Sequence, residues 1–282
     1  MVAAAEILDQ VLCGERMTVT IANEAACYQA WQKMGFATMA PTEIALRAGL
    51  TADRPAWVFI AGYQAAVRTV FPELKTDGWA AFAATENNDE ANHYPGTTLR
   101  HADGKILLSG HKSWVAQSRQ VDQIVVTINS TDIPSQSVLV DRHAPGVVLS
   151  HRPAPKFLAD MSQGFAAFKN VEIEQGGLIE EDRRPAFLGS EPKFVLLAAA
   201  AFLLIRSKDE QIPTLVSLVL SLADYCRSGR EHAQTLVALD RLLQEQLALI
   251  SNTSTIPNWQ TDSRLFSMYS SGIKRRADKK RK

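Results

Sequence analysis

The sequence predicts an α+β protein in three consecutive parts: an N-terminal helical domain, a middle antiparallel β-barrel or sandwich, and a C-terminal helical bundle. Two observations predict this order. Apolar residues recur at helical spacing in the first and last parts of the chain, and short strand-like runs separated by turns fill the middle. We therefore expect domains at 1–77, 78–185 and 186–282.

Composition and charge exclude several classes of protein. The 282 residues carry 30 basic and 30 acidic side chains, so no global field attracts nucleic acid or a membrane surface. Three cysteines without CxxC spacing favour neither a disulfide framework nor a zinc site. No N-terminal leader is visible, and the most apolar run, 194–205, is shorter than the roughly 20 residues that span a bilayer. We expect a cytoplasmic protein without a membrane span.

The N-terminal part is expected to be helical almost throughout. Residues 3–12 and 21–34 read as helices that end at glycines, and Pro41 stands in the first turn of a third. A fourth helix, 57–71, has an apolar stripe along one face and is followed by Pro72. Such a stripe is typical of a helix that packs into a core.

After residue 78 the residue pattern changes from helical to strand-like. An apolar run at 79–84 begins it, and the pair Asp103-Gly104 between two strand-like runs is a strong signal for a tight hairpin. Further strands are expected at 121–128, 137–140, 147–149 and 165–173. Short strands at about ten-residue spacing are typical of a small sandwich or barrel.

The C-terminal part is predicted to be a helical bundle, with helices at 192–207, 213–228, 231–250 and 260–278. Leucines in 231–250 recur at three- and four-residue steps, which gives one apolar face suited to a bundle. The tail 274–282 is strongly basic. We expect a solvated end there, and an arm facing phosphate, nucleic acid or lipid is the alternative.

Two short motifs stand out in the middle part. Thr85-Glu86 follows the first strand, and Lys112 to Val115 reads Lys-Ser-Trp-Val in a later one. Val140-Asp141-Arg142, then Pro145-Gly146-Val147, then the strand-like run 168–173 follow in order. This succession resembles the middle domain of the acyl-CoA dehydrogenase family. The resemblance covers about 75–280 and implies the three-domain fold of that family.

The resemblance also implies a function. It predicts a FAD-dependent oxidoreductase of fatty acid metabolism that acts on an acyl thioester, such as an acyl-CoA, or on a related small molecule. The flavin positions it implies are Phe82, Thr85, Trp114 and Ala116, and the substrate positions are Glu90, Ala91 and Tyr269. Without the resemblance, Thr85 could equally end a strand and Trp114 could be ordinary core.

The sequence departs from the family at the catalytic base. The family's glutamate, which removes the α-proton of the substrate, aligns with Ser270, and a serine hydroxyl needs its own activating base to take a proton. Some family members carry the base on the first helix of the C-terminal bundle. In this chain Glu191 stands just before the helix expected there and is a weak substitute.

Other family features are also changed. A threonine is replaced by Ala116, a Gly-Ser pair is replaced by Glu90-Ala91, and the motifs that bind the partner subunit's FAD have no match in 207–258. Two hypotheses follow. The chain is an oxidoreductase with a changed base, including a monooxygenase that needs no such base, or it is a non-catalytic homologue. The homologue would bind an acyl ligand or a partner subunit and would have partly or wholly lost FAD.

The remaining expectations concern assembly and metals. The family's subunits pair through the C-terminal bundle, so we expect a dimer, either a homo-oligomer or a hetero-oligomer with a related subunit. His93, His101 and His111 share one region but lack the spacing of metal ligands, so no metal site is predicted.

Overall fold

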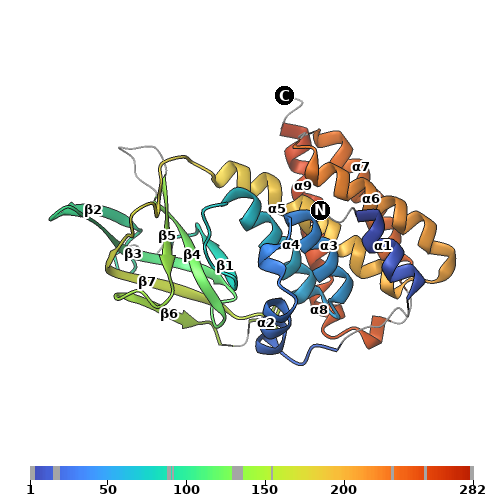
Figure 1. The fold of residues 1–282 in the computed structure, drawn as a ribbon, viewed down its shortest axis with the longest axis horizontal. Helices are drawn as coiled ribbons and strands as arrows, with labels where there is room; N and C mark the ends of the chain where they lie inside the picture. The colour runs from blue at the N-terminus through green and yellow to red at the C-terminus, as the bar shows by residue number, and fades with distance from the viewer. Residues whose placement is uncertain are drawn as a thin grey trace.

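In the computed structural model, helices gather at one end of the molecule and strands at the other (Figure 1). The structure describes residues 4–14, 20–87, 90, 92–128, 136–153, 155–229, 232–250 and 253–279. The chain starts in the helical end, crosses to the β end and returns, so that its first and last parts share one hydrophobic core. The predicted α+β class is confirmed.

The N-terminal helices form where their sequences supply start signals. They are α1 (Ala4–Cys13), α2 (Glu24–Lys33), α3 (Pro41–Thr51) and α4 (Pro55–Val70). The side chain of Asn23 caps α2 by accepting a hydrogen bond from the backbone N–H of Ala26 at 3.0 Å. Both α3 and α4 begin with a proline, whose fixed φ suits the first turn. Nearly all of α4 is buried, which makes it the centre of the helical core.

The strands make two four-stranded sheets. They are β1 (Trp79–Ala83), β2 (Thr98–Ala102), β3 (Lys105–Ala116), β4 (Val121–Ile128), β5 (Gln136–Asp141), β6 (Val147–His151), β7 (Gln163–Glu172) and β8 (Leu178–Ile179). One sheet has the order β1-β4-β5-β8 and the other β2-β3-β7-β6. One pairing differs from the expected antiparallel arrangement, because β1 and β4 run parallel. The chain between them passes through the other sheet, which supplies the crossover that parallel neighbours require.

The predicted hairpin between β2 and β3 is confirmed. Asp103 and Gly104 both have positive φ, at 52° and 72°, and Ala102 pairs with Lys105 across the turn. Two successive left-handed residues match the twist of the flanking strands.

An irregularity in β3 changes the direction in which its side chains point. The register with β7 shifts between Lys112 and Val115. As a result Val115 packs into the core between the sheets, whereas Trp114 packs against the helical core. A bulge of this kind re-aims a side chain beside a site.

The C-terminal helices are α5 (Arg184–Arg206), α6 (Ile212–Arg227), α7 (Ala233–Ala248), α8 (Trp259–Asp262) and α9 (Arg264–Lys279). Two of them differ from the sequence-based expectation. The first helix begins at Arg184 and not near residue 192, and the last expected helix is divided into α8 and α9. The earlier start places Glu191 inside α5, which changes the interpretation of that residue.

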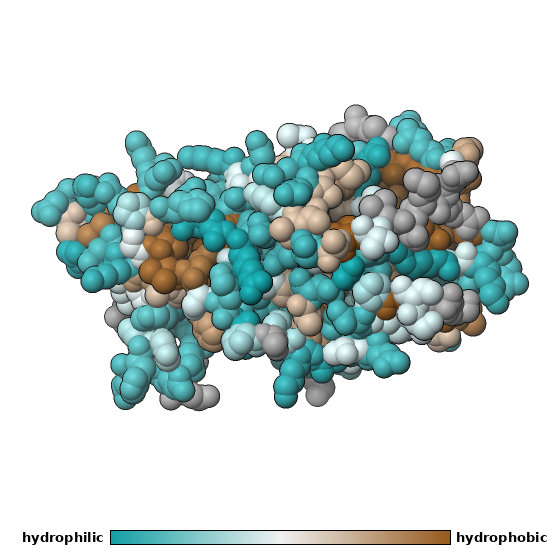
Figure 2. All heavy atoms as spheres, turned by 90° about the horizontal axis from the view of Figure 1, so that it is seen from below, coloured by the Kyte–Doolittle hydropathy of each residue, from teal (hydrophilic) through white to brown (hydrophobic). Residues whose placement is uncertain are grey.

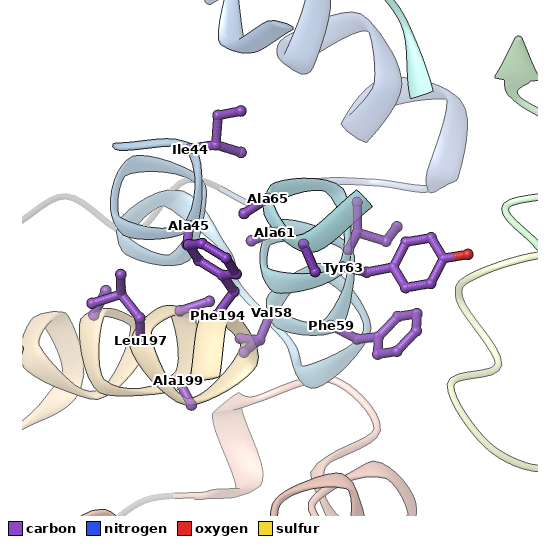
Figure 3. Packing of buried hydrophobic residues seen from close by; sticks show 14 of the residues in the cluster. Ile44, Ala45, Val58, Phe59, Ala61, Tyr63, Ala65, Phe194, Leu197 and Ala199 are labelled. Carbon is purple, nitrogen blue, oxygen red and sulfur yellow. The ribbon is translucent and has the colours of Figure 1, made fainter. Parts of the chain in front are cut away.

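Helix α5 lies against α3 and α4, with Phe194 and Leu197 among the side chains that fill the space between them (Figure 3). The backbones approach closely, because a Cβ added to Gly62 would stand 2.5 Å from Val195. Among the described residues, α5 is also the one helix long and apolar enough to cross a membrane. However, 72% of its apolar window is buried inside this core.

Two side chains of α4 fix the helical end to the β end. The Tyr63 hydroxyl accepts a hydrogen bond from the backbone N–H of Phe82 at 2.7 Å. The Gln64 amide bonds both to the N–H of Ala80, at 3.1 Å, and to its carbonyl, at 2.7 Å. These bonds replace strand partners that the edge strand β1 would otherwise lack, and they hold α4 beside the strands that carry the two motifs.

Candidate active site

A buried ion pair joins the two motifs. The Lys112 ammonium lies 2.7 Å from the Glu86 carboxylate and 3.0 Å from the Thr127 hydroxyl, and its side chain has no exposed surface. The carboxylate also accepts hydrogen bonds from the backbone and hydroxyl of Thr97. Burial acts to raise the pKa of Glu86, but the hydrogen bond and charge of Lys112 bring it below its ordinary value. The pair stays ionised and anchors the loop after β1 to β3.

The anchored loop brings Thr85 beside Trp114. The Thr85 carbonyl accepts a hydrogen bond from the backbone N–H of Ser113 at 2.8 Å, and the Thr85 residue itself is exposed. Trp114 is half-buried, and its indole N–H is 3.4 Å from the side-chain oxygen of Gln163. Two of the four predicted flavin positions therefore lie side by side at one end of β3.

The other two predicted flavin positions are enclosed. The Phe82 ring stacks on Phe71 with centroids 5.3 Å apart, and it packs against Phe187 at 4.5 Å. Ala116 is completely buried in the helical core. Neither side chain presents a free surface to a ligand in this structure.

A cavity of about 370 Å³ opens between α4, α5, α9 and the end of β3. Its lining includes four aromatic residues, one carboxylate and two cations: Phe59, Trp114, Phe157, Tyr269, Glu191, and the Arg275 and Arg276 pair. We call this space the Glu191 cavity. An apolar cavity with a few convergent polar groups is the usual form of a small-molecule site.

Glu191 is the carboxylate that lines this cavity. Burial among apolar neighbours raises its pKa to about 7, against a hydrogen bond from the Tyr269 hydroxyl and the charge of Arg276, which act to lower it. The Tyr269 pKa is raised well above its ordinary value by burial and by the neighbouring carboxylate. A carboxylate with a pKa near neutrality can take and release a proton at physiological pH.

A proline in α5 links this helix to α9. Pro192 has no N–H, so the Leu188 carbonyl one turn earlier lacks its helical partner. The Arg276 guanidinium donates a hydrogen bond to that carbonyl. The helix that carries Tyr269 is thereby attached to the helix that carries Glu191.

Ser270 lies outside the cavity wall. It is buried, and its hydroxyl donates a 2.6 Å hydrogen bond to the carboxylate of Asp240 on α7. Adjacent residues of α9 thus point in different directions, Tyr269 to the cavity and Ser270 to the bundle. Of the predicted substrate positions, Tyr269 lines the Glu191 cavity, Glu90 is exposed elsewhere, and Ala91 lies outside the described residues.

A second hollow lies on the outer face of the sheet β2-β3-β7-β6. It has a volume of about 790 Å³, and its walls include Ser113, Val148, Ser150, Arg152 and Phe165, with Glu90 at one side. We call it the β-face groove. Phe165 and Val148 are 39% and 62% exposed, and an apolar patch is visible at the β-rich end of the molecule (Figure 2). The Arg152 guanidinium lies 4.7 Å from the centre of the Phe165 ring and donates to the Ser113 carbonyl at 2.9 Å.

Two other kinds of site are not supported in the described part of the chain. Ser118 and His151 form a pair at 2.9 Å, but Ser118 is completely buried and lines none of the cavities described above. The described residues contain no group of three His, Cys, Asp or Glu side chains that could hold a metal ion.

The comparisons with known proteins concern the fold. No family model and no curated protein matches the chain. Solved structures do match it. A FAD-dependent dehydrogenase superposes with a TM-score of 0.66 at 13% identity, covering 95% of this chain and 92% of the other. The butyryl-CoA dehydrogenase of Megasphaera elsdenii gives 0.59 at 11% identity, covering 90% and 85%.

A prolyl acyl carrier protein oxidase, AnaB, superposes with a TM-score of 0.59 at 13% identity, covering 94% of this chain and 91% of that one. The chain has the acyl-CoA dehydrogenase fold. This confirms the fold implied by the resemblance in the middle part of the sequence.

The flavin that this fold implies can be tested against the groove. In the β-face groove a planar ring would find an aromatic face at Phe165, a cation at Arg152 and the hydroxyls of Ser113 and Ser150. The groove also adjoins the Thr85 carbonyl through Ser113. These side chains suit a planar ring, but the groove and the Glu191 cavity share no lining residue, so a ring held here would lie apart from Glu191. Glu90 at the side of the groove is a poor neighbour for a phosphate.

Two features of the candidate site were not predicted from the sequence: the Glu86–Lys112 ion pair and the position of Glu191 inside α5. The Glu86–Lys112 pair joins two motifs that the sequence treated separately, and the 26-residue separation gives no local signal for it. Glu191 was expected before its helix because Pro192 reads as a helix start. An earlier proline, Pro185, stands in the true first turn and was the signal that could have located the start.

Proposed function

We propose that this chain is a FAD-dependent oxidoreductase that removes an α-proton from an acyl thioester, with Glu191 as the base. The observation that carries the proposal is Glu191 itself. Its pKa is raised to about 7 by burial, and it lies in an aromatic-walled cavity bounded by Trp114 and Tyr269. A perturbed carboxylate in a cleft of this fold is the pattern expected of a general base.

The residues divide the chemistry among them. Glu191, once ionised, would accept the proton from the carbon next to the thioester carbonyl. FAD, when bound, supplies the acceptor for the hydride that leaves the neighbouring carbon. Trp114, which lines the Glu191 cavity, and Thr85 beside it would hold its ring.

The substrate arm is expected to pass the rim of the Glu191 cavity. Arg275 and Arg276 line the cavity and are both exposed. A thioester carried on a phosphate-bearing arm, as in an acyl-CoA, would place negative charge near them. Arginine is well suited to phosphate because its planar fork gives paired, charge-assisted hydrogen bonds.

A second candidate function is favoured by a specific observation. Phe82 and Ala116 are enclosed by the core, and Glu90 stands beside the β-face groove. These features would suit a homologue that has lost FAD and binds an acyl ligand or a partner subunit. In either case we expect a cytoplasmic dimer or a hetero-oligomer with a related subunit.

The experiment that separates the two candidates begins with protein purified from cells, saturated with FAD and desalted. Flavin bands retained at close to one flavin per chain, and their bleaching by an acyl thioester under anaerobic conditions, would support the oxidoreductase. A colourless protein that still binds acyl-CoA in calorimetry would support the non-catalytic homologue.

A further inference from the structure

One wall of the Glu191 cavity comes from the segment 155–162, which connects β6 to β7. Leu158 of this segment lines the cavity and is only 3% exposed, whereas Arg275 and Arg276 of the same lining are exposed. The leucine therefore lies at the inner end of the cavity and the arginines lie at its mouth. The position of Leu158 decides how deeply a ligand can enter.

The backbone of Leu158 is held in a conformation that a leucine rarely adopts. Its φ is 52°, in the left-handed region where the side chain of a non-glycine residue is crowded. Such a conformation persists only where surrounding contacts enforce it. The contact to its backbone N–H is the Asp262 carboxylate, whose Oδ1 accepts a hydrogen bond at 2.8 Å across a separation of 104 residues.

Asp262 is committed to this contact. It has no exposed surface, and its Oδ2 has no hydrogen-bond partner among the described residues. A buried carboxylate with a free oxygen is costly and calls for an explanation. The hydrogen bond to the Leu158 N–H, which fixes a strained point of the cavity wall, supplies one.

Other contacts fix the rest of the segment. The backbone N–H and the hydroxyl of Ser162 donate to Glu24 at 3.1 Å and 2.9 Å. Asp160 accepts from the Arg54 guanidinium at 2.7 Å. The segment is therefore a fixed wall. Losing the bond to the Leu158 N–H is expected to move that residue and to leave the remainder in place.

We propose that Asp262 is a positioning residue that holds Leu158 at the inner end of the Glu191 cavity and thereby limits the length of the acyl group that the cavity takes. The inference rests on the proposed function, in which this cavity receives the acyl group of a thioester. It adds the substrate class, which is thioesters of short acyl groups, and the residue that sets the limit.

The test compares two probes, butyryl-CoA and decanoyl-CoA, whose Kd values are measured by calorimetry on the full chain. Hydrogen exchange of the backbone amides in 157–161 is followed in the same proteins. In Asp262→Ala the Leu158 N–H loses its acceptor, so exchange should become faster. Decanoyl-CoA should gain on butyryl-CoA by about tenfold or more, because each additional buried methylene strengthens binding roughly fourfold. Asp262→Asn keeps an oxygen acceptor and should match the wild type in both measurements.

Two further variants complete the design. Leu158→Gly removes the side chain at the inner end, and glycine adopts a φ of 52° without strain. It should also shift the preference toward decanoyl-CoA, which tests the wall even if Asp262→Ala fails to fold. Asp122→Ala is the matched control, since it removes a carboxylate that accepts the backbone N–H of Trp79 at 3.0 Å and that does not line the cavity.

The outcomes separate this inference from the proposed function. A wild type that binds neither thioester would contradict both. A wild type that binds butyryl-CoA, with the same length preference in Asp262→Ala and Leu158→Gly, would overturn only the role of Asp262 and its wall, and so would a wild type that binds decanoyl-CoA as tightly. A shift in Asp262→Ala and Leu158→Gly that is absent from Asp262→Asn and Asp122→Ala would support the positioning role.

Discussion

At the scale of single residues, Ser270 and Glu191 lie in different surroundings from those that the family resemblance implied. Ser270 occupies the aligned position of the family's glutamate, yet its hydroxyl is bonded to Asp240 inside the bundle. Glu191 comes from a different helix and faces the cavity.

The raised pKa of Glu191 predicts how stability depends on pH. In the folded protein its pKa is about 7, above the ordinary value of 4.5, so the folded state binds the proton more tightly than the unfolded state. The stabilisation is fully present below about pH 4.5 and is lost as pH rises through about 7. The loss amounts to at most about 3 kcal/mol. Between about pH 5 and 8, the Tm of the wild type should fall relative to that of Glu191→Gln. Parallel Tm curves for the two proteins would contradict the raised pKa.

Ser270→Glu is predicted to destabilise the protein and not to restore a base. The new carboxylate would meet Asp240, which has no exposed surface, and two buried like charges repel strongly. We expect a loss of about 3 kcal/mol or more in denaturant unfolding. Ser270→Ala should lose only about 1–3 kcal/mol, because it leaves a single acceptor unsatisfied. A Ser270→Glu protein as stable as the wild type would mean that the bundle around Asp240 is open.

At the scale of elements, the Glu86–Lys112 pair decides where the two motifs meet. Lys112→Met should destabilise the β domain by about 3 kcal/mol or more, since it leaves a largely buried carboxylate without its cation. The double variant Glu86→Gln, Lys112→Met should recover part of the loss, because no unpaired charge remains. Urea unfolding of the two variants measures the difference. Equal stability of the single variant and the wild type would show that the pair is not a fixed anchor.

The end of α9 provides the second prediction at this scale. Replacing Arg275 and Arg276 together by glutamine should weaken the binding of an acyl-CoA by about tenfold or more, because charge-assisted bonds to phosphate are lost. Calorimetry at two salt concentrations measures the effect. Lys279→Gln is the control, since this exposed cation on the same helix does not line the cavity. Equal weakening by the control would indicate general electrostatic attraction and not a subsite.

At the scale of the whole molecule, the order of the helices and strands was predictable from the sequence. The contacts between elements that are far apart in the chain were not. Turn chemistry located the hairpin at Asp103-Gly104, and periodicity located the core helices, because both signals are local. The parallel pairing of β1 with β4 and the contact of α9 with α5 depend on residues far apart in the chain. The candidate site consists of such contacts, so the sequence indicated Trp114 and Tyr269 but did not bring Glu191 to them.

The most direct measurement of the central claim is the rate at which an acyl thioester bleaches the visible flavin bands of the FAD-loaded protein under anaerobic conditions. The wild type and Glu191→Gln are compared at equal flavin content. If Glu191 is the base, the variant should bind the thioester yet bleach roughly a hundredfold or more slowly. Equal rates in the two proteins, or a wild type that holds no flavin, would contradict the account.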